Sequence, residues 1–296
     1  MDQTHMVWRP GQRSQDQRLG HTKTVKLEVK KMSHTNTCYH FNSAIVRKPS
    51  SSVVNGLRAE DRGNPDYEGV KSEHEAYVLA LETAGMSVTV LPALEAFPDS
   101  IFVEDPALVF SEGAVLLRPG ADSRRGETRE MAPALHDHFD TVLELPPSGY
   151  ADGGDILVTA DAVMIGLSAR TDLAGANSLK DLLKKLGLKG QVVNTPKGVL
   201  HFKTGCSLLD EETILITRHM SRAGLFKGFR NMILPDGEEP AANALRINDT
   251  VLISAQYKRT MDMLDQEGFS VVPVHTSQIE RIDAGLSCMS LRWFKK

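Results

Sequence analysis

Short apolar runs recur in pairs along this chain, and helical segments and a further apolar run separate one pair from the next. The paired runs alternate apolar with polar or small residues and are rich in β-branched side chains, which is typical of strands. They lie at 103–120, 152–171, 204–219 and 241–260. Repeats with a period of roughly 20 to 50 residues indicate propellers or solenoids. The pattern therefore predicts a repeated β-β-α-β unit.

A fifth unit is predicted to be divided between the two ends of the sequence. GLSCMSLRW, at 285–293, supplies one apolar run, and FNSAIVRKPS, at 41–50, supplies another. Pairing of these runs would close the repeats into a ring, which removes exposed strand edges between units. We therefore expect an α/β fold, a five-bladed pseudo-symmetric α/β propeller of ββαβ repeats.

Two of the connecting segments carry clear helical signals. The segment 67–85 ends on a glycine, as many helices do. Its apolar face is predicted to consist of Val70, Tyr77, Leu81 and Ala84. A second helix is predicted over 178–188, where Ser178 and Asp181 have the spacing of a capping box.

The composition is that of an ordinary globular protein able to bury a substantial core. Its formal net charge of −4 argues against a nucleic-acid partner, because surfaces that bind nucleic acids are usually strongly basic. No apolar run reaches the roughly 20 residues of a membrane span, so no membrane partner is expected. Cys38, Cys206 and Cys288 are widely spaced and form no CxxC pair. This pattern excludes a disulfide framework and favours a reducing compartment, the cytoplasm.

The first 40 residues differ from the remainder of the chain. They are polar and basic, show no clear period and lack the apolar segment of a signal peptide. We expect residues 1–40 to be either a disordered extension or the result of a start assigned upstream of Met32. A single propeller domain is expected to span residues 41–296.

Chemically reactive residues fall where the repeats begin. Loops at one end of a pseudo-symmetric ring converge on its axis, so these side chains are expected to meet. The candidates are Asp99, Glu104, Asp105, Asp152, His201 and Cys288, with Arg118 and Arg170 at the ends of inner hairpins. Taken alone, a lone cysteine is usually a small buried side chain, and DGGD is usually a turn. Their joint occurrence at equivalent places in successive repeats favours an active site.

Six motifs of this chain resemble those of the dimethylarginine dimethylaminohydrolases, in the guanidino-group-modifying or pentein superfamily. They are DSIFVEDPALV, LLRPGADSRRGE, DGGDILVT, GLSART, GVLHFKTGCSLL and IDAGLSCMSL, and they occur in the family's order over about residues 41 to 293. The resemblance implies the five-bladed propeller fold. It also implies hydrolysis of Nω-methylated or dimethylated arginine to citrulline and methylamine or dimethylamine.

The resemblance implies that Cys288 is the nucleophile, His201 the general acid and base, and Asp152 the group that orients His201. The chemistry agrees with these roles. A guanidinium carbon is a poor electrophile because its charge is delocalised, so it needs a strong, soft nucleophile such as a thiolate. We expect such a thiolate at Cys288 to react with iodoacetamide below the ordinary thiol pKa of about 8.5.

The remaining substrate contacts also follow from the resemblance. Glu104 and Asp105 would hold the guanidinium group, and Asp99 would lie nearer the α-amino end of the substrate. Arg118 and Arg170 would bind the substrate carboxylate, for which the guanidinium fork is suited. Backbone groups of Leu57 and Ile282 would touch substrate, Leu57 from a flexible lid loop at 48–57.

Two alternatives remain open. Arginine deiminases resemble this chain, but they typically carry an aspartate two residues after the histidine, where this chain has Lys203. A cation at that place disfavours binding of free arginine. Outside the hydrolases, the alternative is a non-catalytic propeller that acts as a binding module.

No cofactor is implied, and the expected partner is a small molecule, a methylated arginine. The resemblance implies no metal for catalysis. Zinc bound at Cys288 would only inhibit, because the chemistry needs a free thiolate. The sequence leaves open whether the protein is a monomer or a homodimer.

Overall fold

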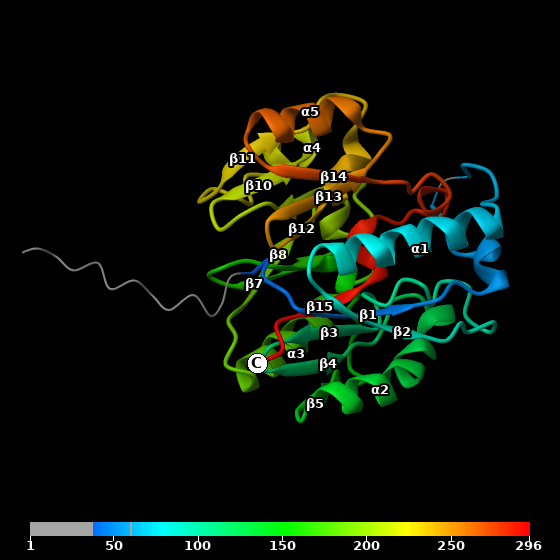
Figure 1. Ribbon diagram of the computed structural model, residues 1–296. Coiled ribbons are helices and arrows are strands. Elements are labelled where there is room, and N and C mark those ends of the chain that lie inside the picture. The colour runs from blue at the N-terminus through cyan, green and yellow to red at the C-terminus, as the bar shows by residue number, and fades with distance from the viewer. Residues whose placement is uncertain (1–37, 60) are drawn as a thin grey trace, which may run out of the picture. The chain divides into compact units, whose positions relative to one another are not determined.

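Five three-stranded sheets form the repeating units of the computed structural model, which describes residues 38–59 and 61–296 (Figure 1). In each sheet the middle strand pairs antiparallel with one neighbour and parallel with the other. A helix connects the middle strand to its parallel neighbour, because a parallel pair needs a crossover connection. The predicted five-bladed α/β propeller of ββαβ repeats is confirmed.

The elements of the five blades have the following bounds. The strands are β15 (Leu291–Trp293), β1 (Ser43–Arg47) and β2 (Ser87–Leu91) in blade 1; β3 (Ala107–Phe110), β4 (Gly113–Leu116) and β5 (Val142–Glu144) in blade 2; β6 (Ile156–Val158), β7 (Val163–Leu167) and β8 (Gly190–Asn194) in blade 3; β9 (Cys206–Leu208), β10 (Thr213–Ile216) and β11 (Arg230–Ile233) in blade 4; and β12 (Leu245–Ile247), β13 (Thr250–Ser254) and β14 (Ser270–Val274) in blade 5. The α-helices are α1 (Tyr67–Thr83), α2 (Glu127–His138), α3 (Leu173–Lys185), α4 (Arg218–Arg222) and α5 (Lys258–Gln266). The 3₁₀ helices are η1 (Ser51–Asn55), η2 (Asp122–Arg124), η3 (Gly153–Asp155), η4 (Phe202–Thr204), η5 (Glu239–Asn243), η6 (Ile279–Ile282) and η7 (Leu286–Met289).

Blade 1 joins the two ends of the described chain, as the sequence predicts. The C-terminal strand β15 pairs antiparallel with β1, with Ser43 opposite Trp293 and Ile45 opposite Leu291. Figure 1 shows the two strands, at opposite ends of the colour range, side by side. The pairing brings the residues just before β15, including Cys288, into the ring.

The apolar core consists of clusters that lie between adjacent blades. One cluster joins blade 1 to blade 2, and others join blades 2 and 3, 3 and 4, 4 and 5, and 5 and 1. The middle strands are buried on both faces, which is why they read as continuous apolar runs. Their fully buried side chains include Ile45, Val115, Ile165, Ile214 and Leu252. Burying each such side chain contributes about 1.5–3 kcal/mol, so closure of the ring is stabilised at every blade interface.

Helix α1 has the apolar face expected from its sequence. Val70, Tyr77 and Leu81 are fully buried against blades 1 and 5. The helix begins after Asp66, whose carboxylate accepts a hydrogen bond from the backbone N–H of Gly69 at 2.8 Å. Past its end, Gly85 has a φ of +93°, a conformation that glycine adopts without strain.

The start predicted for the second helix is wrong. Helix α3 begins at Leu173, and Ser178 lies inside it. The N-cap is Asp172, whose carboxylate accepts from the N–H of Gly175 at 2.6 Å. Gly175 weakens the local helical signal. A Cβ atom at Gly175 would collide with the backbone of Tyr150, so packing requires glycine within this first turn.

The expectation of a disordered or mis-assigned extension concerns residues 1–40, of which 1–37 lie outside the described residues. In the part of the chain that the structure describes, no helix combines the length and the apolar character needed to cross a membrane.

Candidate active site

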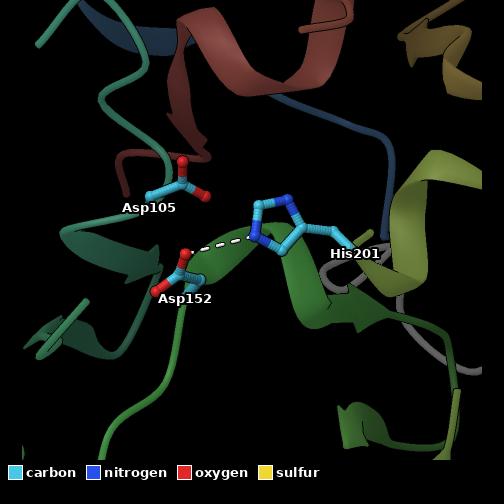
Figure 2. A group of neighbouring side chains, drawn as sticks. All are labelled: Asp105, Asp152 and His201. Carbon is cyan, nitrogen blue, oxygen red and sulfur yellow. Dashed lines mark hydrogen bonds and ion pairs between the residues drawn. The ribbon is translucent and has the colours of Figure 1, made fainter. Parts of the chain in front are cut away.

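Four short segments from different blades carry the candidate catalytic residues. Asp152 directly precedes η3, His201 directly precedes η4, and Cys288 lies within η7. Asp105 lies just before Pro106 and the start of β3. Figure 2 shows Asp105 and Asp152 on the same side of the His201 ring. The predicted convergence of the repeat loops is therefore realised for Asp105, Asp152 and His201.

Asp152 and His201 form a tightly held pair. The Nε2 atom of His201 lies 3.1 Å from Oδ2 of Asp152 (Figure 2). The other carboxylate oxygen of Asp152 accepts from the N–H of Gly120 at 2.7 Å, and Asp152 is completely buried. Both oxygens are thus occupied, which fixes the plane of the carboxylate and with it the imidazole.

The charges around His201 keep its ring protonated. Burial by itself would lower the pKa of His201, but the hydrogen bond to Asp152 and the charges of Asp105, Asp155 and Asp152 raise it to about 9. At neutral pH the ring is therefore an imidazolium, which has a proton to donate. This is the state that a general acid requires.

The glycines of the DGGD turn let the loops approach each other closely. A Cβ atom at Gly154 would lie 2.8 Å from Cγ and Nδ1 of His201, and one at Gly153 would collide with the backbone of Glu104. Neither glycine has a positive φ. These positions therefore require glycine because of space near the catalytic residues and not because of a turn conformation.

Asp105 is anchored by an arginine that the sequence motifs did not single out. Arg124, at the end of η2, forms a buried ion pair with Asp105 and another with Glu127 at 2.7 Å. Burial disfavours the charged carboxylate, yet Arg124 and then His201 hold the pKa of Asp105 below its ordinary value. The second oxygen of Asp105 accepts from the N–H of Gly154 at 3.1 Å. Arg124 lies within the motif LLRPGADSRRGE, and its i, i+3 spacing to Glu127 is a further sequence signal.

Asp99 meets the predicted lid loop. Its Oδ1 accepts from the backbone N–H of Leu57 at 2.9 Å. Leu57 itself is 39% exposed, whereas Asp99 is buried. Burial raises the pKa of Asp99, and the nearby charges of Arg124 and Arg170 oppose that rise. Leu57 and Asp99 therefore lie together as the sequence suggests, and Ile282 lies close by, because a Cβ atom at Gly56 would contact both Ile282 and Asp99.

The two predicted guanidinium ligands differ in their surroundings. Glu104 is an ion-pair partner of Lys203 at 2.5 Å and of Arg292 at 3.2 Å, both through Oε1. Its Oε2 accepts from the hydroxyl of Ser287 at 3.1 Å. Two cations thus neutralise Glu104, whereas Asp105 has one arginine. The role of Glu104 as a guanidinium ligand stays a prediction.

The thiol of Cys288 is not ionised in the unliganded protein. Burial, followed by the charges of Glu104 and Asp105, raises its pKa to about 12, and Lys203 only partly opposes this. The structure thereby corrects the expectation of a thiolate that reacts below the ordinary thiol pKa. Ionisation of Cys288 needs an additional positive charge at the site.

The two predicted carboxylate-binding arginines are placed differently. Arg170 is half-buried and close enough to Asp99 to lower the pKa of that carboxyl. Arg118 instead donates from Nη1 to the backbone carbonyls of Pro147 and Gly149, at 3.2 and 3.1 Å. Those bonds hold the loop after β5, so contact between Arg118 and substrate stays a prediction.

Asp105, Asp152 and His201 also offer ligand atoms within 4.8 Å of one another, close enough for a metal ion (Figure 2). The protonated state of His201 argues for proton transfer instead. An imidazolium has no free lone pair for a metal, and Asp105 already pairs with Arg124. The prediction of inhibitory zinc at Cys288 is a separate one and stays a prediction.

Comparison of the chain with known proteins identifies relatives that are similar in sequence and in structure. The sequence profile described as "Arginine deiminase" matches residues 71–233. The chain is 40% identical to an N(G),N(G)-dimethylarginine dimethylaminohydrolase of Pseudomonas aeruginosa, over 86% of this chain and 100% of that relative. The structure is similar to that of the Pseudomonas aeruginosa enzyme in a cysteine-to-serine mutant complexed with citrulline, with a TM-score of 0.83 and 39% identity over 86% of this chain and 100% of the other.

A second solved structure has the same TM-score of 0.83, with 40% identity over 85% of this chain and 99% of the other. It is a dimethylarginine dimethylaminohydrolase in which a histidine is replaced by glycine, as an adduct with S-methyl-L-thiocitrulline. Identity at this level over nearly the whole relative, together with the shared fold, shows the family. This chain belongs to the dimethylarginine dimethylaminohydrolase family of guanidino-group-modifying enzymes.

Proposed function

We propose that this protein hydrolyses Nω-methylated or Nω,Nω-dimethylated arginine to citrulline and methylamine or dimethylamine. One observation carries the proposal. The imidazolium of His201 is held by buried Asp152. The charge of Asp105 raises the pKa of both His201 and Cys288, so the imidazolium and the thiol lie near the same carboxylate. A proton donor and a nucleophile that gains reactivity from a cationic substrate suit cleavage of a guanidinium C–N bond.

Substrate binding would activate the nucleophile. Burial and the carboxylates of Glu104 and Asp105 keep the thiol of Cys288 protonated, with a pKa of about 12. A guanidinium placed beside the thiol supplies a positive charge that favours the thiolate. The thiol proton leaves to solvent, since His201 already carries its own proton. Only a cationic substrate would thus convert Cys288 into a nucleophile.

The chemical steps then follow from the protonation states. The sulfur of Cys288 attacks the guanidinium carbon and forms a C–S bond. His201 donates its proton to the departing methylamine or dimethylamine as the C–N bond breaks, which leaves a thiouronium intermediate. Neutral His201 takes a proton from water and the hydroxide adds to the carbon. The C–S bond then breaks, and the proton of the new hydroxyl group passes through solvent to the released amine, which leaves as an ammonium ion. Citrulline and the Cys288 thiolate are released, and His201 is again an imidazolium.

Binding of the substrate would use groups around this centre. Glu104 and Asp105 are both candidates for the guanidinium: Glu104 already pairs with Lys203 and Arg292, and Asp105 already pairs with Arg124. Asp99, together with the backbone of Leu57 and Ile282, would lie toward the amino end of the substrate. Arg170 would face the carboxylate.

Arginine deimination is the second candidate, because the arginine deiminase profile matches more than half of the chain. Lys203 argues against it. Its ammonium group is bound to Glu104 at 2.5 Å, so this position offers a cation where an unsubstituted guanidinium would need a carboxylate.

A product assay separates these candidates. Citrulline and dimethylamine release from asymmetric dimethylarginine is measured in parallel with ammonia release from arginine, for the wild type, Cys288→Ser and Cys38→Ser. Cys38 is also a half-buried free cysteine and serves as the matched control. We expect turnover of dimethylarginine by the wild type and Cys38→Ser, and none by Cys288→Ser. Turnover of arginine alone would establish the deiminase, and turnover of neither would favour a non-catalytic binding module.

A further inference from the structure

One asparagine connects the loop of the proposed nucleophile to the loop of the proposed acid. Asn243, the last residue of η5, donates from Nδ2 to the backbone carbonyl of Lys203 at 3.1 Å. Its Oδ1 accepts from the backbone N–H of Ser287 at 2.9 Å, and its Nδ2 also lies 3.1 Å from the hydroxyl oxygen of Ser287. These three bonds use the carbonyl and the amino group of one side chain.

The partners of Asn243 are adjacent to the reacting side chains. Ser287 directly precedes Cys288 in η7, and Lys203 lies two residues after His201 in η4. We propose that Asn243 is a positioning residue that holds Cys288 in register with His201. The inference rests on the function proposed above.

The local packing is shaped to the Asn243 side chain. A Cβ atom at Gly285, the residue that caps η7, would collide with Cγ and Oδ1 of Asn243. The hydroxyl of Ser287 accepts from Asn243 and donates to Oε2 of Glu104, which fixes the direction of the hydrogen bonds. A primary amide both donates and accepts, so the geometry uses a property that a carboxylate does not have.

The inferred role affects the chemical step and leaves substrate binding intact. The proposed substrate contacts are Leu57, Asp99, Glu104, Asp105, Arg170 and the backbone of Ile282, which ends η6 ahead of η7. None of these residues is a hydrogen-bond partner of Asn243. Releasing η7 from η4 would therefore misalign sulfur and imidazole without loosening the substrate. A misplacement of this kind costs on the order of 100-fold in rate.

The test compares kcat and KM for asymmetric dimethylarginine in Asn243→Ala and in a matched control, Asn248→Gly. Asn248 lies in the same blade and likewise accepts one hydrogen bond and donates two. It accepts from the N–H of Phe41 at 3.0 Å and donates to the carbonyls of Phe41 and Ala84 at 3.0 and 2.8 Å. Glycine suits its φ of 51°. We expect both variants to lose thermal stability. Only Asn243→Ala should lose about 10- to 100-fold in kcat, with KM within roughly threefold of the wild type.

Asn243→Asp supplies a readout that a purely structural role would not move, and it serves if Asn243→Ala does not fold. The carboxylate keeps the acceptor for Ser287 and loses the donor toward Lys203. Its charge lies beside the Cys288 loop, so it should disfavour the thiolate that forms with substrate bound and shift the rising limb of the pH profile of kcat to higher pH.

Three results would overturn the inference: unchanged kcat in folded Asn243→Ala, a rise in KM equal to the loss in kcat/KM, or an unshifted pH profile in Asn243→Asp. Each of these leaves the proposed function standing if the wild type is active. A wild type that releases no citrulline from dimethylarginine would overturn both.

Discussion

The protonation state of His201 depends on Asp152, and Asp152→Asn tests that dependence. The substitution removes the charge and keeps the size of the side chain. Because the N–H of Gly120 donates to Oδ1 of Asp152, an asparagine there would keep its carbonyl toward Gly120 and turn its amino group toward His201. An amino group facing Nε2 favours the unprotonated nitrogen. Loss of the carboxylate and the new donor both disfavour the imidazolium.

The magnitude follows from the pKa of His201. Its rise from 6.5 to about 9 corresponds to about 3.4 kcal/mol of preference for the charged ring. Asp152→Asn removes the hydrogen bond and one of three carboxylate charges while burial still lowers the pKa of His201, so this pKa should fall toward 6.5 although Asp105 and Asp155 remain. At pH 8 the protonated fraction would then fall from near unity to a few per cent, roughly a 30-fold loss of general acid.

The assay is the pH profile of kcat at saturating dimethylarginine, combined with an NMR titration of the His201 ring. We expect the wild type to lose activity as pH rises through about 9, and Asp152→Asn to lose it near 6.5. Asp161→Asn is the control, because Asp161 is an exposed acid in the turn between β6 and β7 and should leave the profile unchanged. A His201 pKa that stays near 9 in Asp152→Asn would refute the reasoning.

The same shift predicts how stability depends on pH. The folded pKa of His201 lies above its unfolded value, so the stability it contributes is complete below pH 6.5 and is lost as pH rises through about 9. The difference in free energy of unfolding between the wild type and Asp152→Asn should therefore shrink over this range. Denaturant titrations at pH 6 and pH 9.5 measure it, and an unchanged difference would contradict the assignment.

Two further substitutions test how the loops are held together. Gly154→Ala places a Cβ atom 2.8 Å from the His201 ring, so kcat should fall at least tenfold, whereas Gly228→Ala, at a glycine with open space around it, should match the wild type. Equal activity of the two variants would mean that the ring shifts at no cost. Asp283, with a φ of 55°, accepts a hydrogen bond from the N–H of Ala59 beside the lid loop. Asp283→Asn keeps an oxygen that can accept from Ala59 and should retain the KM for dimethylarginine. Asp283→Gly keeps the backbone conformation but loses this acceptor, so it should raise KM. Equal KM values would contradict a link between Asp283 and the lid loop.

Local pattern was sufficient for much of the fold. Strand pairs, turns and helices are set by side-chain periodicity within a few residues, so the repeats of β-β-α-β appear directly in the sequence. Even the divided blade could be predicted, because an unpaired apolar run at each end leaves one missing strand pair in the ring. The start of α3 was missed since Gly175 is required by its contact with Tyr150, a residue in the loop between β5 and η3.

The candidate site, like the fold, was predictable in part from the sequence and depended in part on tertiary contacts. The places of Cys288, His201 and Asp152 at the starts of repeats made them candidates, and the family resemblance implied their roles. The pairing of charges was visible in neither. Arg124 stabilises Asp105, and Lys203 and Arg292 share Glu104, through contacts between segments far apart in the sequence.

Sequence by itself thus determined the repeat and the order of the blades, since these depend on local spacing, and it supplied the candidate residues for the chemistry through their places in the repeats and the family resemblance. Tertiary structure alone decided which of those residues are charged. Burial and neighbouring carboxylates keep Cys288 a neutral thiol far above its ordinary pKa, and the hydrogen bond to Asp152 and nearby carboxylates overcome burial to make His201 an imidazolium. A pKa depends on desolvation and on charges brought close by folding, and neither can be read from the spacing of residues along a chain.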